Sequence, residues 1–223
     1  MNFDTRKHKL ERCRRLVVHP GRGPLAAHVN KDADITAMRE SPSSSDFTIH
    51  CRGREFKVHK DVLSLRSRYF LRMFQQRYLE TVTGKIELQD EDPDAVADMI
   101  GYMYSTHFYR VQMPDPTYIA MIDRHVQLCI VADKYEVDGL LHVALNGVRR
   151  SFSFCPADDW PSPAALLRII THVYDSTTER STLRRIMVES LSQPRYNSLI
   201  DSMRERLYES PDFLYDMMKQ LRC

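Results

Sequence analysis

Polar side chains that can do chemistry are concentrated in the stretch EFKVHKDVLSLRSRYF, from Glu55 to Phe70. It carries His59, Lys60, Asp61 and two serines between aliphatic residues. A histidine close to hydroxyl and carboxylate groups can act as a general base or can activate a nucleophile. The same residue types also occur where a strand hands over to a helix. This stretch is therefore the edge of a catalytic site or a structural junction, and the choice decides between an enzyme and a binding module.

Motifs of enzymes are absent from the rest of the sequence. It contains no G-x-S-x-G elbow, no G-x-x-x-x-G-K-[ST] or G-x-G-x-x-G loop and no H-E-x-x-H helix, and its seven glycines offer little material for a phosphate cradle. The carboxylates Asp90, Glu91 and Asp92 precede Pro93, which predicts helix N-terminal caps. We expect no catalytic residue and no cofactor, although a site assembled from residues distant in sequence stays open as an alternative.

The cysteines do not indicate a metal site. There are five, they are widely scattered, and none forms a C-x-x-C pair. His50, Cys51 and His59 are the nearest approach to a ligand set, but neighbouring strand residues point to opposite faces, so His50 and Cys51 do not converge on one ion. We expect reduced, mostly buried thiols and no bound metal.

Charge is unevenly distributed. Residues 1–45 hold nine Lys or Arg and five Asp or Glu, whereas the whole chain of 223 residues has a net charge of only +2. The basic run RKHKLERCRR, Arg6 to Arg15, has two interpretations: a disordered, solvated arm over residues 1–44, which we favour, or a nuclear address that contacts nucleic acid. No segment has the length of a membrane span or the apolar core of a signal peptide, so we expect an intracellular protein of the cytoplasm, the nucleus or both.

Periodicity predicts an ordered domain from about Asp46. Alternating apolar residues predict a β-hairpin over 47–58 with a turn at Arg52-Gly53, and a three- and four-residue spacing predicts a helix over 60–74 that breaks near Ser64 to Ser67. KIEL predicts a third strand and Asp92-Pro93 the start of a helix. This order of strands and helices defines an α+β fold.

The second half of the chain has only helical periodicity. A helical pair is expected within residues 117–152. After a Pro-rich break, four amphipathic runs follow, at 166–174, 183–191, 199–207 and 213–221. We predict three parts: a basic arm at 1–44, an α+β domain at 45–152 and a helical extension at 153–223.

Residues 45–105 resemble a BTB/POZ domain. The resemblance rests on short blocks in a fixed order: Ser45-Asp46, F-x-V-H-K from Phe56, V-L-S from Val62, S-x-Y-F from Ser67, I-x-L from Ile86 and D-x-D-P from Asp90. VADKYEVDGL, Val131 to Leu140, fits a later helix of the family. The resemblance implies a short three-stranded sheet with a helical cluster, used for protein–protein contact. Without kelch repeats or zinc-finger spacing, the chain is similar to short, stand-alone BTB proteins of fungi.

The resemblance resolves the question that the first stretch raises. It implies that His59 closes the second strand as a buried residue that bonds a carbonyl, and that Asp61 complements the positive end of a helix. Ser64 and Ser67 then satisfy backbone groups where two helices meet. On this interpretation the stretch is structural.

Two partner surfaces are implied by the resemblance. The first is a two-fold dimer interface built from the opening strand and the first helix, in which Asp46 and Lys60 form a charge pair. Its predicted members are Asp46, Phe47, Ile49, Lys60, Val62, Leu63, Arg66 and Tyr69.

The second surface resembles the hydrophobic-x-Glu motif of family adaptors that recruit a cullin. Tyr78, Leu79 and Glu80 supply this motif, with an aromatic ring and a carboxylate typical of a binding hot spot. Aromatic residues that follow are expected to flank it: Tyr104, Phe108 and Tyr109. The other interpretation is that Tyr78 only covers the edge of the domain.

These observations predict a protein–protein interaction module rather than an enzyme. It would dimerise or act as an adaptor, with a cullin-based ubiquitin ligase as the partner complex. The alternative is a nuclear transcription cofactor whose basic arm contacts DNA.

Overall fold

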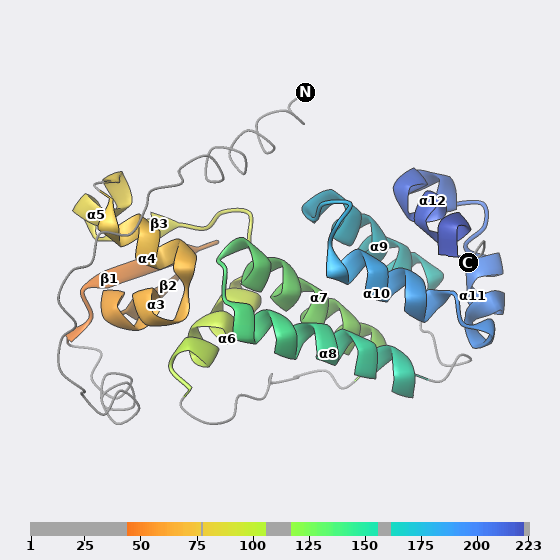
Figure 1. Ribbon diagram of the computed structural model, residues 1–223, viewed down its shortest axis with the longest axis horizontal. Coiled ribbons are helices and arrows are strands. Elements are labelled where there is room, and N and C mark those ends of the chain that lie inside the picture. The colour runs from red at the N-terminus through yellow and green to blue at the C-terminus, as the bar shows by residue number, and fades with distance from the viewer. Residues whose placement is uncertain (1–43, 77, 106–116, 156–161, 221–223) are drawn as a thin grey trace. The chain divides into compact units, whose positions relative to one another are not determined.

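The computed structural model describes residues 44–76, 78–105, 117–155 and 162–220 of the chain. All of them lie within one compact unit, Asp32–Cys223. Figure 1 shows the elements of this unit, which begin with a small sheet and continue as helices to the C-terminus. The predicted basic arm falls, except for Ser44, outside the described residues.

The sheet has the strand order β2-β1-β3. Strands β1 (Phe47–Cys51) and β2 (Arg54–Val58) are antiparallel, with Ile49 opposite Phe56. Arg52 and Gly53 both have positive φ, +44° and +83°, which is the backbone of a type I′ hairpin turn. Strand β3 (Lys85–Glu87) pairs with β1 in parallel. The predicted hairpin and third strand are confirmed.

Three short helices separate β2 from β3. They are α3 (Lys60–Arg66), α4 (Arg68–Gln75) and α5 (Leu79–Thr83). Ser67 divides α3 from α4 with extended backbone angles, so the predicted break is confirmed. Its hydroxyl accepts a hydrogen bond from the Phe70 amide at 3.1 Å and donates one to the Tyr135 carbonyl at 2.6 Å.

Longer helices follow the sheet. Asp92 is the N-cap of helix α6 (Pro93–Met103). Its carboxylate accepts hydrogen bonds from the amides of Asp94 and Ala95. Helices α7 (Tyr118–Lys134) and α8 (Asp138–Phe154) lie side by side in Figure 1 as the predicted helical pair. The tight turn between them places Glu136 at φ +52°.

The C-terminal part is helical, as expected, but more broken. It contains α9 (Pro163–Ser176), α10 (Thr182–Leu191), η2 (Pro194–Tyr196), α11 (Asn197–Ser202), η3 (Leu207–Glu209) and α12 (Pro211–Gln220). The single run predicted at 199–207 is wrong, because α11 ends at Ser202 and turns connect it to η3.

One continuous hydrophobic core joins the sheet to the helices. It includes Ile49 from β1, Phe70 from α4, Val126 from α7 and Ile170 from α9, all fully buried. Helix α9 packs on α7 and α10 packs on α8, so the C-terminal helices extend the core of the domain. In the described ranges, no helix combines the length and the apolar character needed to cross a bilayer.

Candidate partner-binding surfaces

His59 does not line a catalytic cleft. Its ring is buried, and the hydroxyl oxygen of Tyr104 lies 2.8 Å from both its main-chain nitrogen and its Nδ1. Its Nε2 lies 2.9 Å from the hydroxyl of Ser44. The His59 N–H donates to Tyr104, and both ring nitrogens have hydroxyl partners. The expected burial is confirmed, but the expected carbonyl partner is wrong, because a tyrosine hydroxyl takes its place.

Tyr104 is consequently not part of a partner surface. It lies at the end of α6, and its side chain is only 7% exposed. Burial raises the pKa of its hydroxyl, while the amide of His59 lowers it by a smaller amount. The predicted flanking role of Tyr104 is corrected by this position in the core. Phe108 and Tyr109 lie outside the described residues.

The acidic residues before α6 have different roles. Asp92 caps the helix as expected, whereas Glu91 is buried and pairs with the ammonium of Lys134. The carboxylate of Glu91 also accepts a hydrogen bond from the Tyr135 hydroxyl at 3.2 Å. Glu91 therefore ties the start of α6 to the end of α7, and the expectation that it caps a helix is wrong.

The predicted dimer surface is reduced by burial. Four of its members are buried core residues and present no side chain to a partner: Phe47, Ile49, Val62 and Leu63. Their apolar side chains belong to the common hydrophobic core, which the strand and helix patterns alone do not reveal. Asp46 stays exposed, and Lys60, Arg66 and Tyr69 are half-buried.

The expected charge pair between Asp46 and Lys60 takes another form. The carboxylate of Asp46 accepts from the main-chain amide of Lys60 at 2.9 Å, at the first residue of α3. The Lys60 ammonium instead lies 5.9 Å from the ring centres of Phe47 and Phe74. Asp46 therefore acts as a capping group for α3.

Helix α5 presents the most exposed apolar side chains around the sheet. Leu79 and Val82 are 75% and 76% exposed, and Tyr78, which precedes the helix, is 44% exposed. Glu80 lies in the first turn, half-buried. We call Tyr78, Leu79, Glu80 and Val82 the α5 surface. Its residues include the predicted hydrophobic-x-Glu motif.

The α5 surface is held by bonds at both ends of the helix. Near its start, one residue after Glu80, the Thr81 hydroxyl donates to the carbonyl of Met73 in α4 at 2.8 Å. At its end, Gly84 adopts φ +69°, and its carbonyl accepts from the Thr48 amide of β1 at 2.9 Å. A side chain is strained at that φ, so glycine favours this ending. Exposed apolar groups on an anchored helix are typical of a binding site.

Three exposed apolar residues were not expected to be accessible. Val82, Leu71 in α4 and Leu65 in α3 are 76%, 38% and 48% exposed. The signal for Val82 was available in the sequence, since it follows Leu79 by three residues and so shares its helical face. Leu65 is exposed although Val62 and Leu63, three and two residues before it in the same helix, are buried.

The described part of the chain shows no metal-binding site. No three His, Cys, Asp or Glu side chains there come together as ligands. Cys51 is buried and donates to the Glu91 carbonyl at 3.5 Å, while His50 next to it is half-exposed. Burial raises the pKa of the Cys51 thiol, with the Glu91 charge adding to this shift.

A small sheet joined to a helical cluster, with polar residues committed to backbone junctions, defines a protein-interaction domain. The family model of the BTB/POZ domain matches residues 35–148, about half of the chain. The chain belongs to the BTB/POZ family. The predicted domain at 45–152 overlaps most of this match.

Curated relatives match part of the chain. TD and POZ domain-containing protein 4 of Mus musculus is 27% identical over 123 residues, 54% of this chain and 30% of its own length. Kelch-like protein 30 of Homo sapiens is 30% identical over 82 residues, 36% of this chain and 14% of its own length. The chain thus spans less than a third of either relative.

Solved BTB domains also align with the chain. The BTB domain of zebrafish PATZ1 is 15% identical, covers 57% of this chain and 99% of its own, and has a TM-score of 0.43. The BTB domain of human gigaxonin is 15% identical, covers 57% and 98%, and has a TM-score of 0.41.

Proposed function

We propose that this protein is an adaptor that docks a cullin through the α5 surface. The observation that carries the proposal is the exposure of Tyr78, Leu79 and Val82 on a helix fixed at both ends. A BTB/POZ domain is a protein–protein interaction module, and the hydrophobic-x-Glu motif of cullin-recruiting adaptors resembles Tyr78 to Glu80. The fold itself does not need these side chains, because none of them belongs to the core.

The energetics favour a hot spot at this surface. Burying Leu79 and Val82 under a partner would stabilise the complex by about 1.5–3 kcal/mol for each side chain that becomes fully covered. Tyr78 adds an aromatic ring, a type enriched at the centre of interfaces. Glu80 supplies a carboxylate that can accept hydrogen bonds beside this apolar group.

A pull-down with purified cullin tests the proposal. Replacing Tyr78 and Glu80 with alanine should weaken binding by at least about tenfold, the equivalent of about 1.4 kcal/mol. Leu79→Asp should abolish it, since a charge would enter the apolar contact. All variants should keep the melting temperature of the unmodified protein, because none of the replaced side chains belongs to the hydrophobic core.

The matched control is Tyr208→Ala. Tyr208 in η3 is 72% exposed and lies far from α5 in the sequence. It should leave cullin binding unchanged. If the unmodified protein does not retain cullin, or if Tyr208→Ala weakens binding as much as the α5 variants do, the adaptor role is refuted.

Homodimerisation is a second function that one observation favours. Leu65 on α3 is 48% exposed, next to the half-buried Arg66 of the predicted dimer surface. A two-fold axis would bring two copies of such a patch together.

The alternative that the basic arm contacts DNA concerns residues outside the described ranges. Deletion of residues 2–16, with DNA binding measured at several salt concentrations, would test it.

A further inference from the structure

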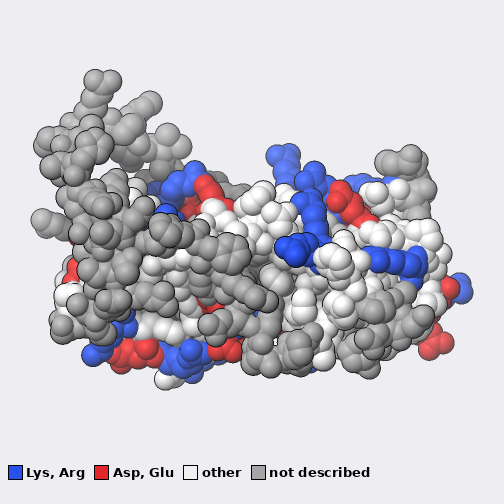
Figure 2. Space-filling model, turned by 90° about the horizontal axis from the view of Figure 1, so that it is seen from below, with Lys and Arg blue, Asp and Glu red and all other residues white. Residues whose placement is uncertain are grey.

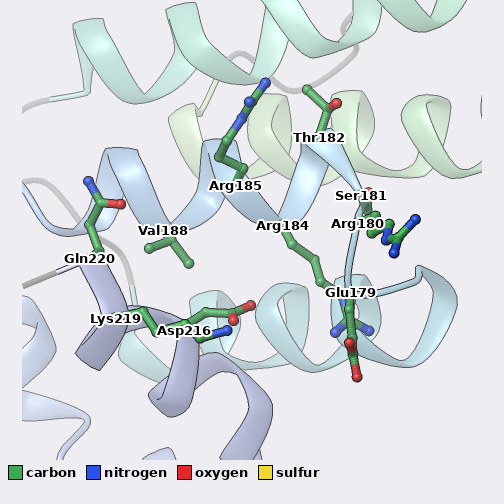
Figure 3. Close-up of a pocket in the computed structure, with 10 residues that line it drawn as sticks. All are labelled: Glu179, Arg180, Ser181, Thr182, Arg184, Arg185, Val188, Asp216, Lys219 and Gln220. Carbon is green, nitrogen blue, oxygen red and sulfur yellow. The ribbon is translucent and has the colours of Figure 1, made fainter. Parts of the chain in front are cut away.

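A pocket lies between α10 and α12. Its residues, between Glu179 and Gln220, include none of the α5 surface. Its volume is about 350 Å³, and cationic and hydroxyl side chains provide much of its lining. Figure 3 shows Arg184 from α10 and Lys219 from α12 on its two sides, with Arg180 and Ser181 before the start of α10. The volume lies at the lower end of the range typical of ligand sites.

Arg184 is the central observation. Its side chain is 5% exposed, and its guanidinium donates to three neutral acceptors: the Tyr174 carbonyl, the Thr177 carbonyl and the Thr177 hydroxyl. It also lies 4.3 Å from the ring centre of Tyr174. Among the ion pairs of the described residues, none includes Arg184. A buried cation without an anionic partner is costly, so an anion in this pocket would be stabilised.

Two further cations reach the same pocket. Arg180 is exposed beside Ser181, and the Lys219 ammonium lies 4.3 Å from the Tyr215 ring. Arg185 also lines the pocket, but in Figure 3 its guanidinium points away from Arg184. It lies 3.7 Å from Glu189 instead.

Two carboxylates oppose these cations. Asp216 accepts a hydrogen bond from the Tyr174 hydroxyl at 2.9 Å, which occupies one of its oxygens. Glu179 is exposed at the rim. Residues 162–220 as a whole hold eight Lys or Arg and eight Asp or Glu, whereas the pocket lining holds four and two. Without Arg185, which lies beside Glu189, three cations face two carboxylates, so the lining still has an excess of positive charge.

Lys and Arg side chains are also visible on one outer face of the chain. Figure 2 shows Lys and Arg side chains over the right half of the view, with fewer Asp and Glu side chains among them. A surface of this kind attracts anionic groups in general.

We infer that this pocket binds a phosphorylated serine or threonine segment of a partner protein. A phosphate group carries a charge of about −1.5 to −2 and three acceptor oxygens, which suits a pocket lined by several cationic and hydroxyl side chains better than a single carboxylate does. The hydroxyls of Ser181 and Thr182, at the start of α10, line the same pocket and add donors. A segment with several carboxylates would meet Asp216 and Glu179, whereas one compact dianion can lie against the arginines.

Fluorescence anisotropy with the full chain tests this site without any cullin. The probe is a fluorescein-labelled peptide pool with one fixed phosphoserine and randomised flanks, compared with pools that carry serine or glutamate at that position. The phosphoserine pool should bind at least tenfold more tightly than either of the others. Inorganic phosphate in excess should displace it.

Charge-neutralising variants assign the binding to the pocket. Arg180→Gln with Lys219→Gln should weaken binding at least fivefold, since both replaced cations line the pocket. The control pair, Arg149→Gln with Arg204→Gln, removes the same charge at exposed positions that do not line it and should change binding less than twofold. Arg184 is left unchanged, because its bonds also hold the end of α9.

Three results would overturn the inference. They are equal binding of the serine pool, equal binding of the glutamate pool, and an equal loss in the control pair, which would mean attraction by net charge alone. None of them bears on the α5 surface, and failure of cullin to bind does not affect this assay. The two proposals can therefore fail separately.

Discussion

The hydroxyl oxygen of Tyr104 lies 2.8 Å from the main-chain nitrogen of His59 and 2.8 Å from its Nδ1. Forty-five residues separate the two in sequence, and the contact joins the end of β2 to the end of α6. One hydroxyl thereby satisfies a buried amide at the point where the strand hands over to α3. The hydroxyl serves the backbone rather than a substrate.

Tyr104→Phe should destabilise the protein by about 1–3 kcal/mol, because it leaves the buried His59 N–H without an acceptor. Urea denaturation followed by circular dichroism measures this change. Tyr208→Phe is the control, since Tyr208 is 72% exposed and its hydroxyl should contribute less than about 0.5 kcal/mol. Equal stability of the two variants would contradict the role given to Tyr104.

Gly147 in α8 permits close packing against α7. A Cβ at this position would lie 2.1 Å from Cδ2 and 2.7 Å from Cγ of His125, whose Nδ1 lies 2.7 Å from the Met121 carbonyl. Alanine would gain about 1 kcal/mol of helix propensity, but overpacking costs about 1–3 kcal/mol. Because the His125 ring is anchored, we expect Gly147→Ala to lower the free energy of unfolding.

Gly139→Ala is the matched comparison in the same helix. There the added Cβ would come closer than 3 Å to one atom, the Tyr102 hydroxyl oxygen, whereas at Gly147 it would come that close to three ring atoms of His125. It should cost less than Gly147→Ala in a thermal melt. Gly147→Ala should lower the free energy of unfolding less in a protein that already carries His125→Ala than in the unmodified protein. Equal costs for the two glycine variants would argue against an anchored ring.

Glu136 makes part of the stability dependent on pH. Its carboxylate accepts hydrogen bonds from Arg72, and this contact, opposed by partial burial, lowers the pKa of Glu136 below its usual value of 4.5. The contribution is complete above pH 4.5 and is lost as the pH falls through the lower pKa of the folded state. It is modest, less than about 1 kcal/mol, because the pair is partly exposed.

Glu136→Gln should therefore be less stable than the unmodified protein at pH 7, and the difference should shrink as the pH falls below 4.5. Denaturant titrations at several pH values would show the two curves converge as the pH falls. Glu205→Gln, at an exposed position, should show no such convergence. A constant difference from pH 7 to pH 3 would mean that the charge of Glu136 is not responsible.

Local patterns were sufficient to predict the hairpin and the helix break. Gly53 suits positive φ, and the hydroxyl of Ser67 competes with the helix for backbone bonds, so both features are encoded by neighbours in sequence. The start of α6 followed from Asp92 and Pro93 for the same reason.

Partners distant in sequence could not be predicted. The patterns show that His59 and Glu91 are followed by helices, but not that Tyr104 bonds the first or that Lys134 pairs with the second. The predicted dimer surface failed in part for a related reason. Strand and helix periodicity indicates which side chains share a face, but whether Val62 meets the core or a partner depends on the packing of α3 against the sheet.

Leu65 is the residue of α3 best placed to join two copies of the chain. Its neighbours Val62 and Leu63 are buried, so they stabilise the fold, whereas Leu65 is 48% exposed and has no such task. Leu65→Asp should raise the dissociation constant of a homodimer at least tenfold, since the charge would have to be desolvated at the interface. Sedimentation velocity over a range of concentrations measures this change.

Two control variants separate this interface from general effects. Val82→Asp places the same charge on the α5 surface, where the residue is 76% exposed, and should leave dimerisation unchanged. Val62→Asp should instead unfold the protein, because its side chain is 1% exposed. A monomer at every concentration, or equal weakening by Leu65→Asp and Val82→Asp, would exclude α3 as the dimer interface. Dimerisation that only Leu65→Asp weakens would place the two-fold contact on α3 and leave α5 free for a different protein.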